Sequence, residues 1–211
     1  TREAIDPVRY ISNHSSGKQG HAIAGALAAL GAEVTLVTGP VGVADPAGVK
    51  VVRVESADDM LAACRAALPA DIAVCAAAVA DWKVRNAANG KLKKVPGAAP
   101  PALELVPNPD ILASLAASGP QRPALVVGFA AETENVVANA VAKRERKGCD
   151  WIVANDVSPA TGTFGGDRNT VHLVTASGVE AWPTLAKGAV AEELARRVVR
   201  HFGTGGAVAA S

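Results

Sequence analysis

The chain has 211 residues, which is enough for one sizeable hydrophobic core, and its 21 Lys and Arg nearly balance its 20 Asp and Glu. The formal net charge of +1 argues against a general affinity for nucleic acid or for an acidic membrane surface. Hydrophobic residues make up 49% of the chain and aromatic residues only 3%, so we expect alanine-rich helices packed on strands of valine, isoleucine and leucine.

Hydrophobic segments and cysteines indicate the environment of the chain. No apolar run reaches the roughly 20 residues that a membrane-spanning helix needs, so no membrane association is expected. Cys64, Cys75 and Cys149 are widely spaced and odd in number, which argues against a disulfide framework and against a zinc site. The sequence therefore predicts a protein of a reducing compartment, the cytoplasm.

The first third of the chain alternates between helical and strand patterns. Apolar positions at helical spacing predict a helix over residues 18–30, with a terminating glycine next. Strands are expected over residues 33–38 and 49–54. Ser56, with Asp59 three residues later, is typical of a capping box that opens a helix to about residue 68.

An apolar strand beginning at residue 71 leads into a segment without periodicity, residues 83–101. This segment, "KVRNAANGKLKKVPGAAPP", is rich in Gly, Pro and Lys and is predicted to be a long surface loop. A short strand is expected over residues 102–106. Asn108 and Pro109 then predict the N-cap and first position of another helix.

The second half completes the pattern of an α/β protein. We expect strands at 124–130 and 150–156, helices at 134–147 and 186–202, and an antiparallel hairpin over residues 170–183. Residues 203–211 are expected to be a flexible tail. The order of elements predicts a three-layer, Rossmann-like α/β domain whose central sheet is mainly parallel, with a small antiparallel extension near the C-terminus.

The loop "SNHSSGKQG" precedes the first predicted helix and offers donors for an anion. Ser15, Ser16, Gly17 and Lys18 stand where the unpaired N–H groups of a helix N-terminus would point. The loop matches neither the phosphate loop of common NTPases nor the glycine fingerprint of dinucleotide enzymes. By itself it is equally consistent with an ordinary helix cap.

Two segments could supply polar and cationic groups to a ligand. Asp81, in "AAAVADWKV", follows a buried strand and could accept from a hydroxyl group or bind a metal ion, or could simply be solvated. The lysines of "GKLKK", Lys91, Lys93 and Lys94, could close over a polyphosphate or could form an exposed loop.

Two further features lie on the predicted strand and helix beyond that loop. Phe129 ends a buried strand and could stack on a base. Lys143 and Lys147 are four residues apart and share one helix face, where they could bind phosphates or merely complement the helix dipole.

Taken together, these motifs occur in a distinctive order. "TREAIDPVRYISNHSSGKQG", "AAAVADW", "GKLKK", "NPDIL" and "GFAAET" closely resemble the phosphopantothenoylcysteine synthetase family of the bacterial, CTP-dependent type, over residues 1–202. The resemblance implies that CTP activates the carboxylate of 4′-phosphopantothenate as an acyl-cytidylate and releases pyrophosphate. The amine of cysteine then displaces CMP.

The resemblance also implies partners beyond these substrates. Mg²⁺ would be required, and the protein would be a homodimer with sites near the subunit interface. In the family this domain usually follows a flavin-dependent decarboxylase domain, so we expect no flavin in this chain. The first strand of the family's sheet precedes the segment "TREAID", and we expect it to be missing from the sequence given.

Residue roles follow from the matching positions. Asn13 is expected to act on the acyl-cytidylate in the second half-reaction, Lys91 to be a lid lysine essential for forming it, and Asp81 to bind CTP or its metal ion. Arg9 is a candidate for the substrate phosphate. The remaining expected CTP contacts are Ser15, Ser16, Gly17, Lys18, Cys75, Ala76, Ala77, Pro109, Asp110, Ile111, Leu112, Phe129, Lys143 and Lys147.

Two other functions are compatible with the fold class. A nicotinamide-dependent Rossmann oxidoreductase would share the alternating elements, although the glycine fingerprint and a Tyr-x-x-x-Lys pair are lacking. A non-catalytic dimerisation module of a larger flavoprotein would use the hairpin near residues 171–182 for self-association. The second function predicts no nucleotide binding.

Overall fold

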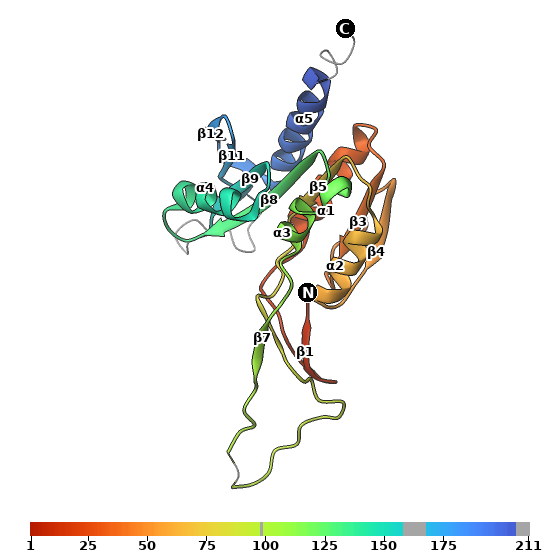
Figure 1. The fold of residues 1–211 in the computed structure, drawn as a ribbon, viewed down its shortest axis with the longest axis vertical. Helices are drawn as coiled ribbons and strands as arrows, with labels where there is room; N and C mark the ends of the chain where they lie inside the picture. The colour runs from red at the N-terminus through yellow and green to blue at the C-terminus, as the bar shows by residue number, and fades with distance from the viewer. Residues whose placement is uncertain (98, 158–167, 206–211) are drawn as a thin grey trace.

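The computed structural model describes residues 1–97, 99–157 and 168–205, and its centre is a five-stranded sheet (Figure 1). The strand order is β12-β11-β9-β8-β5. β5 (Ile72–Cys75), β8 (Leu125–Glu132) and β9 (Trp151–Asp156) are parallel. β11 (Val171–Thr175) and β12 (Gly178–Ala181) are antiparallel to their neighbours.

The expected α/β architecture is therefore confirmed, but the expectation of a mainly parallel Rossmann-like central sheet needs correction. The sheet is mixed, because the predicted hairpin is built into it beside β9. Moreover, β3 (Val34–Thr38) and β4 (Val49–Arg53) form a separate parallel pair.

Helices cover both faces of the mixed sheet. α1 (Lys18–Ala29) and α5 (Lys187–Gly205) pack together on one face, over a core that contains Ile23, Leu194 and the β8 residues Leu125 and Val127. α3 (Ile111–Ala116) and α4 (Val136–Lys147) lie on the other face. The β8 sequence is continuously apolar because Val126, between Leu125 and Val127, faces this second core.

The β3–β4 pair is followed by α2 (Ala57–Ala66), which begins at the predicted capping box. Ser56 Oγ accepts a hydrogen bond from Asp59 N at 3.1 Å, and an Asp59 carboxylate oxygen accepts one from Ser56 N at 3.0 Å. The reciprocal pair satisfies backbone donors at the helix start, which explains why this boundary could be predicted. Met60 of α2 packs with Ile111 and Leu115 of α3 in a third core.

Four short strands form an arm that extends from the body in Figure 1. β1 (Glu3–Asp6) pairs with β2 (Arg9–Ile11), and β6 (Trp82–Val84) pairs with β7 (Leu105–Pro107), both antiparallel. β1 packs beside β6. The predicted boundaries of the loop at 83–101 and of the strand at 102–106 are therefore wrong. Residues 83 and 84 belong to β6, and the next strand starts at Leu105.

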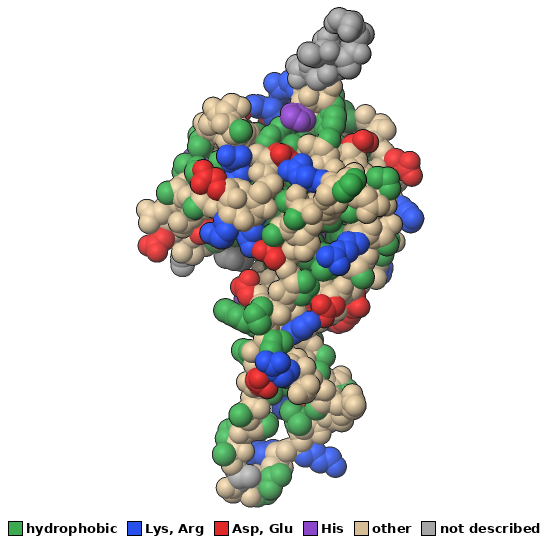
Figure 2. All heavy atoms as spheres, viewed as in Figure 1, with side chains coloured by type: hydrophobic (Ala, Val, Ile, Leu, Met, Phe, Trp, Pro, Cys, Tyr) green, Lys and Arg blue, Asp and Glu red, His purple; other side chains and the backbone are tan. Residues whose placement is uncertain are grey.

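Apolar side chains are visible along this arm among charged ones, and charges of both signs are interspersed over the visible face of the body (Figure 2). Six of the large hydrophobic residues on the arm are exposed: Val8, Tyr10, Trp82, Val95, Leu103 and Leu105. Exposed apolar residues that gather on one segment are typical of a surface that contacts a partner.

Two further boundaries differ from the sequence prediction. The N-cap of α3 is Asp110, whose carboxylate accepts from Ala113 N at 3.0 Å, so Asn108 and Pro109 precede the helix. The terminal helix α5 continues through Gly205, beyond the predicted end at residue 202. The remainder of the predicted tail, residues 206–211, lies outside the described residues.

The remaining elements are short. A 3₁₀ turn, η1 (Gly119–Gln121), follows α3, and β10 (Arg168–Asn169) pairs with β13 (Leu185–Ala186) ahead of α5. In the part of the chain that the structure describes, no helix is long and apolar enough to cross a membrane.

Packing beside β8 leads to the first prediction. A methyl group at Gly128 would lie 2.6 Å from Leu112 Cδ2 and 2.8 Å from Ile152 Cδ1. Because overpacking a core costs about 1–3 kcal/mol, Gly128→Ala should lower the free energy of unfolding by roughly that amount in urea denaturation. Gly188→Ala is the control, since open space surrounds that position, and it should leave stability unchanged or slightly raised. Equal stability of the two variants would contradict the prediction.

Candidate nucleotide site

The candidate site lies at the carboxyl end of β5, beside the neighbouring strand β8. Cys75, the last residue of β5, is paired in register with Gly128, so Phe129 on β8 lies one position beyond the end of β5. Ala76 and Ala77 continue from β5. Because parallel strands end at a common edge, and ligands of open α/β sheets bind outside that edge, these residues occupy a favourable place for a ligand.

The first turn of α1 approaches the same edge. A Cβ atom built on Gly20 would be 3.9 Å from Ala76 Cβ, which is ordinary van der Waals contact. Small residues on both segments therefore allow the helix and the strand end to lie close together. The predicted donors Ser15, Ser16 and Lys18 precede or begin this helix, so the structure brings the first loop to the end of β5.

Gly17 is the N-cap of α1 and has a left-handed backbone conformation, with φ of 74°. A Cβ atom at this position would also lie 2.9 Å from Val41 Cγ1, so both the torsion angle and the packing require glycine. The Gly17 carbonyl accepts from His21 N at 3.1 Å, and His21 Nδ1 lies 3.0 Å from the same oxygen. His21 is buried and was not singled out from the sequence, although its place four residues after Gly17 is the helical spacing that permits this contact.

Asn13 is tied to the segment that follows β5. Its side-chain Nδ2 donates to Val79 O at 3.0 Å. On the other side of this segment, Asn108 Nδ2 donates to Ala80 O at 2.8 Å and Asn108 N donates to Asp81 O at 2.9 Å. The proposed catalytic amide and the exposed Asp81 side chain are thus placed by one hydrogen-bonded segment.

Lys143 lies on α4 against the edge of β8. Its ammonium group donates to Phe129 O at 2.8 Å, and burial lowers the pKa of this lysine below its ordinary value. The sequence predicted only that Lys143 shares a helix face with Lys147, and its contact with β8 is revealed by the structure. The contact is to the backbone of Phe129, which lies within β8 because the strand continues to Glu132, so the prediction that Phe129 ends its strand is wrong.

Lys147, one turn further along α4, forms an ion pair with Asp110, the N-cap of α3. Burial opposes the ionisation of Asp110, but hydrogen bonds from Lys147 and from Ala113 N outweigh it and lower the pKa of the carboxyl group. The pair joins α3 to α4 beside the predicted nucleotide segment, which comprises Pro109, Asp110, Ile111 and Leu112. Ile111 and Leu112 themselves are buried in the core, so only their backbone groups are suited to a ligand.

Lys91, Lys93 and Lys94 lie on the arm, in the loop between β6 and β7. Figure 1 shows this loop extending away from the body, so the structure does not bring Lys91 together with Phe129 and Lys143. The neighbouring residue Leu92 is held by β1: its N–H donates to Asp6 Oδ2 at 3.0 Å.

Arg9 is also part of this contact. Its Nε donates to Asp6 Oδ2 at 3.0 Å, and its Nη2 donates to the same carboxylate and, at 2.8 Å, to Leu92 O. The hydrogen bonds from Arg9 hold the pKa of Asp6 far below its usual range. Asp6, which the sequence did not single out, thus fastens the lysine loop to β1, a contact that only the tertiary structure reveals.

No group of three or more His, Cys, Asp or Glu side chains with metal-binding geometry occurs within the described ranges. Asp81 offers one exposed carboxylate, two residues after Val79, to which Asn13 is bound. A hard cation such as Mg²⁺ accepts one or two carboxylates together with phosphate oxygens and water.

The fold is that of an α/β domain, and the candidate site lies at the carboxyl edge of its parallel strands. A family model described as the DNA/pantothenate metabolism flavoprotein C-terminal domain matches residues 1–202, and the chain belongs to this family. It is 45% identical over 204 residues to the coenzyme A biosynthesis bifunctional protein CoaBC of Vibrio vulnificus, which covers 96% of this chain and 51% of that protein. The chain thus spans about half the length of the curated relatives it matches.

Solved structures show the same fold. The crystal structure of the C-terminal domain of a coenzyme A biosynthesis bifunctional protein CoaBC has a TM-score of 0.78 and 36% identity, covering 97% of this chain and 92% of that one. A Cab2 variant in complex with phosphopantothenate-cysteine has a TM-score of 0.77 at 16% identity, covering 100% of this chain and 86% of that one, and this likeness concerns the fold alone.

The Asp110–Lys147 pair yields a prediction about stability. Asn caps a helix about as well as Asp, so Asp110→Asn removes mainly the ion pair and should lower the free energy of unfolding by ~0.2–1 kcal/mol at pH 7. Because the pKa of Asp110 is lowered in the folded state, this contribution is present above the ordinary carboxyl pKa and is lost as the pH falls through the folded-state value. Urea denaturation should therefore show the difference shrinking below about pH 4.

A double-mutant cycle with Lys147→Met provides the control. If the two side chains act through their pair, the double variant should be less destabilised than the sum of the single variants. Additive effects, or a difference that does not change with pH, would show that the pair contributes nothing measurable.

Proposed function

We propose that this domain is a CTP-dependent phosphopantothenate–cysteine ligase of coenzyme A biosynthesis. The observation that carries the proposal is the convergence of Asn13, the N-terminus of α1 and the segment after β5, at the sheet edge where the sequence motifs predicted a nucleotide. Membership of the pantothenate metabolism family and the 45% identity to a coenzyme A biosynthesis protein support it.

The first half-reaction would take place at the β5 edge. The N–H groups at the start of α1, with Ser15, Ser16, Gly17 and Lys18, would bind the triphosphate, since a helix N-terminus favours an anion. Cys75, Ala76 and Ala77, with residues 109–112, would contact the nucleotide through backbone groups. Phe129 would lie by the base, and Lys143 and Lys147 by the ribose or phosphates.

The pantothenate carboxylate would attack the α-phosphorus of CTP and pyrophosphate would leave. Lys91 would neutralise the charge that develops on the phosphates in this step. In the second half-reaction the amine of cysteine would attack the acyl carbon and CMP would leave. The Asn13 amide could donate to the oxygen that becomes negative, because it does not titrate in the physiological range.

The implied partners fit the residues present. Asp81 would help to hold Mg²⁺ that enters with the CTP phosphates, and Arg9 would face the substrate phosphate through the part of its guanidinium that is exposed. We infer a homodimer in which the apolar surface of the arm is a subunit contact, since these residues are exposed in one chain. In a longer protein, a flavin-dependent decarboxylase domain would precede residues 1–202.

We further infer a cytoplasmic setting without nucleic-acid or membrane partners. The three cysteines are free, and burial raises the pKa of the Cys75 thiol to about 12, so it is suited to packing at the strand end rather than to redox chemistry. The near-neutral net charge agrees with small-molecule substrates.

Pyrophosphate release tests the proposal with its residues. Wild type with 4′-phosphopantothenate, CTP and Mg²⁺ should release pyrophosphate and, with cysteine added, form ligated product. Lys91→Ala should release none, because its charge acts in the first half-reaction. Asn13→Ala should still release pyrophosphate but form little ligated product.

Binding provides the independent control. CTP with Mg²⁺ should raise the melting temperature of the wild type, whereas NADPH should not. A rise with NADPH is the result that a nicotinamide-dependent oxidoreductase would give. If the wild type neither releases pyrophosphate nor binds CTP, the ligase proposal is wrong and a non-catalytic interaction module gains support.

A further inference from the structure

We propose that Asp6 is a positioning residue for the proposed catalytic Lys91, through a clip that fastens the base of the lysine loop to the arm. The clip consists of the Asp6 carboxylate, the Arg9 guanidinium and the backbone of Leu92. The inference rests on the proposed function for the role of Lys91, but the clip itself is defined by hydrogen bonds and burial.

The Asp6 carboxylate is fully enclosed and multiply bonded. Its side chain is 0% exposed, whereas that of Arg9 is 49% exposed. One oxygen accepts from Val8 N at 3.0 Å, and the other accepts from Arg9 and from Leu92 N at 3.0 Å. A buried carboxylate is stable only when its lone pairs are satisfied, so the Leu92 N–H is an integral part of the charge's environment.

Arg9 closes the clip from the other side. Its Nη2 bonds both the Asp6 carboxylate and Leu92 O. The N–H and the C=O of Leu92 are therefore both bound by one ion pair, which fixes the backbone orientation at that residue. Lys91 immediately precedes Leu92 in the sequence, so the main chain of Lys91 is attached to a residue whose position is fixed.

A second attachment lies on the other side of Lys91. Ala88 N donates to Ile5 O at 2.9 Å, so the loop is bound to β1 at residue 88 as well as at residue 92. Only Asn89, Gly90 and Lys91 span the interval. This short interval limits the volume that the lysine side chain can reach.

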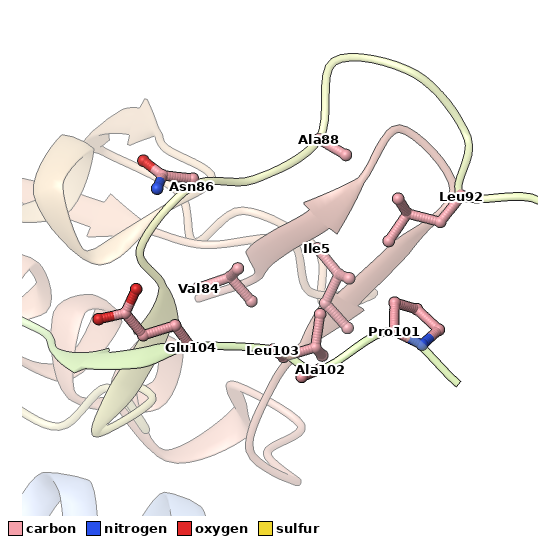
Figure 3. Close-up of a pocket in the computed structure, with 9 residues that line it drawn as sticks. All are labelled: Ile5, Val84, Asn86, Ala88, Leu92, Pro101, Ala102, Leu103 and Glu104. Carbon is pink, nitrogen blue, oxygen red and sulfur yellow. The ribbon is translucent and has the colours of Figure 1, made fainter. Parts of the chain in front are cut away.

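An apolar hollow supports the same attachment. Leu92, Ile5, Val84, Ala88, Pro101 and Leu103 line a cavity of about 240 Å³ on the arm, together with Asn86, Ala102 and Glu104 (Figure 3). Leu92 thus has its backbone bound by the clip and its side chain at an apolar cavity wall. Together these contacts distinguish Leu92 from a residue of a freely exposed loop.

The experiment compares Asp6→Asn with Glu104→Gln. Asn keeps the size of the side chain but removes the charge that holds Arg9 and Leu92 together. Glu104→Gln removes a second Arg–carboxylate pair on the same arm, the one in which Glu104 accepts from Arg85 Nε at 2.6 Å. Both proteins are assayed for pyrophosphate release, for cysteine-dependent product formation, and for the CTP–Mg²⁺ shift in melting temperature.

Asp6→Asn should slow pyrophosphate release about tenfold to a hundredfold, with the CTP-induced melting shift retained, because a misplaced catalytic group reduces the rate without removing the nucleotide site. Glu104→Gln should release pyrophosphate at nearly the wild-type rate. Unchanged pyrophosphate release by Asp6→Asn would overturn the proposal. So would a defect confined to the cysteine-dependent step, because that result would mean that Asp6 acts through the β1–β2 hairpin and Asn13.

A double-mutant cycle separates positioning from a general loss of structure. Leu92→Pro removes the N–H that donates a hydrogen bond to Asp6, while Leu92→Ala retains this N–H and reports the loss of the side chain. If Asp6 acts through Leu92, adding Asp6→Asn to Leu92→Pro should cause little further loss of rate, whereas adding it to Leu92→Ala should cause nearly its full effect. Equal additional losses in both backgrounds would refute the clip.

The rate of limited trypsin cleavage tests whether the clip holds the lysine loop, and it does so without measuring ligase activity. Cleavage after Lys91, Lys93 and Lys94 should be faster in Asp6→Asn than in Glu104→Gln, because the released loop enters the protease more readily. If the wild type proved to have no ligase activity, this comparison would still test the attachment. Identical cleavage rates would show that the clip does not hold the loop.

Discussion

The attachment of residues 79–81 is the constraint on which the candidate site depends. Asn13 binds the carbonyl of Val79, and Asn108 binds the carbonyls of Ala80 and Asp81. Since this segment continues directly from β5, these bonds fix the direction in which the chain leaves the parallel sheet. They also fix the position of Asn13 and Asp81 relative to the first turn of α1, which contacts the end of β5 through small residues.

The distance in sequence between contacting residues explains which features of the structure were predictable. The capping box of α2 and the hairpin of β11 and β12 depend on residues only a few positions apart, so the local pattern contained the information. The start of α3 could not be predicted from the local pattern. Asn108, Pro109 and Asp110 all suit a helix start, and the choice was made by the bonds of Asn108 to Ala80 and Asp81, far away in sequence.

Strand direction and the arm were also beyond a local pattern. The apolar run of β8 indicates burial on both faces, but it does not state whether β11 joins the sheet in a parallel or antiparallel sense. The Asp6–Leu92 contact joins residues 86 positions apart, and each side looks ordinary alone: a turn containing Pro7, and a lysine-rich loop. The motifs therefore indicated candidate site residues, while the contacts that orient those residues required the tertiary structure.

The lysines of the body and of the arm differ in the free energy needed for each to bind a polyanion. In the body, Lys143 donates to Phe129 O and Lys147 pairs with Asp110, so a phosphate that recruits either lysine must replace an existing partner. Lys91 is exposed on the arm, away from the body, so its recruitment requires that the loop and a nucleotide come together, and that its side chain and the short loop around it become ordered. Fixing a residue's backbone costs roughly 1–2 kcal/mol. By binding residues 88 and 92 in advance, the arm reduces the number of residues that remain to be ordered around Lys91.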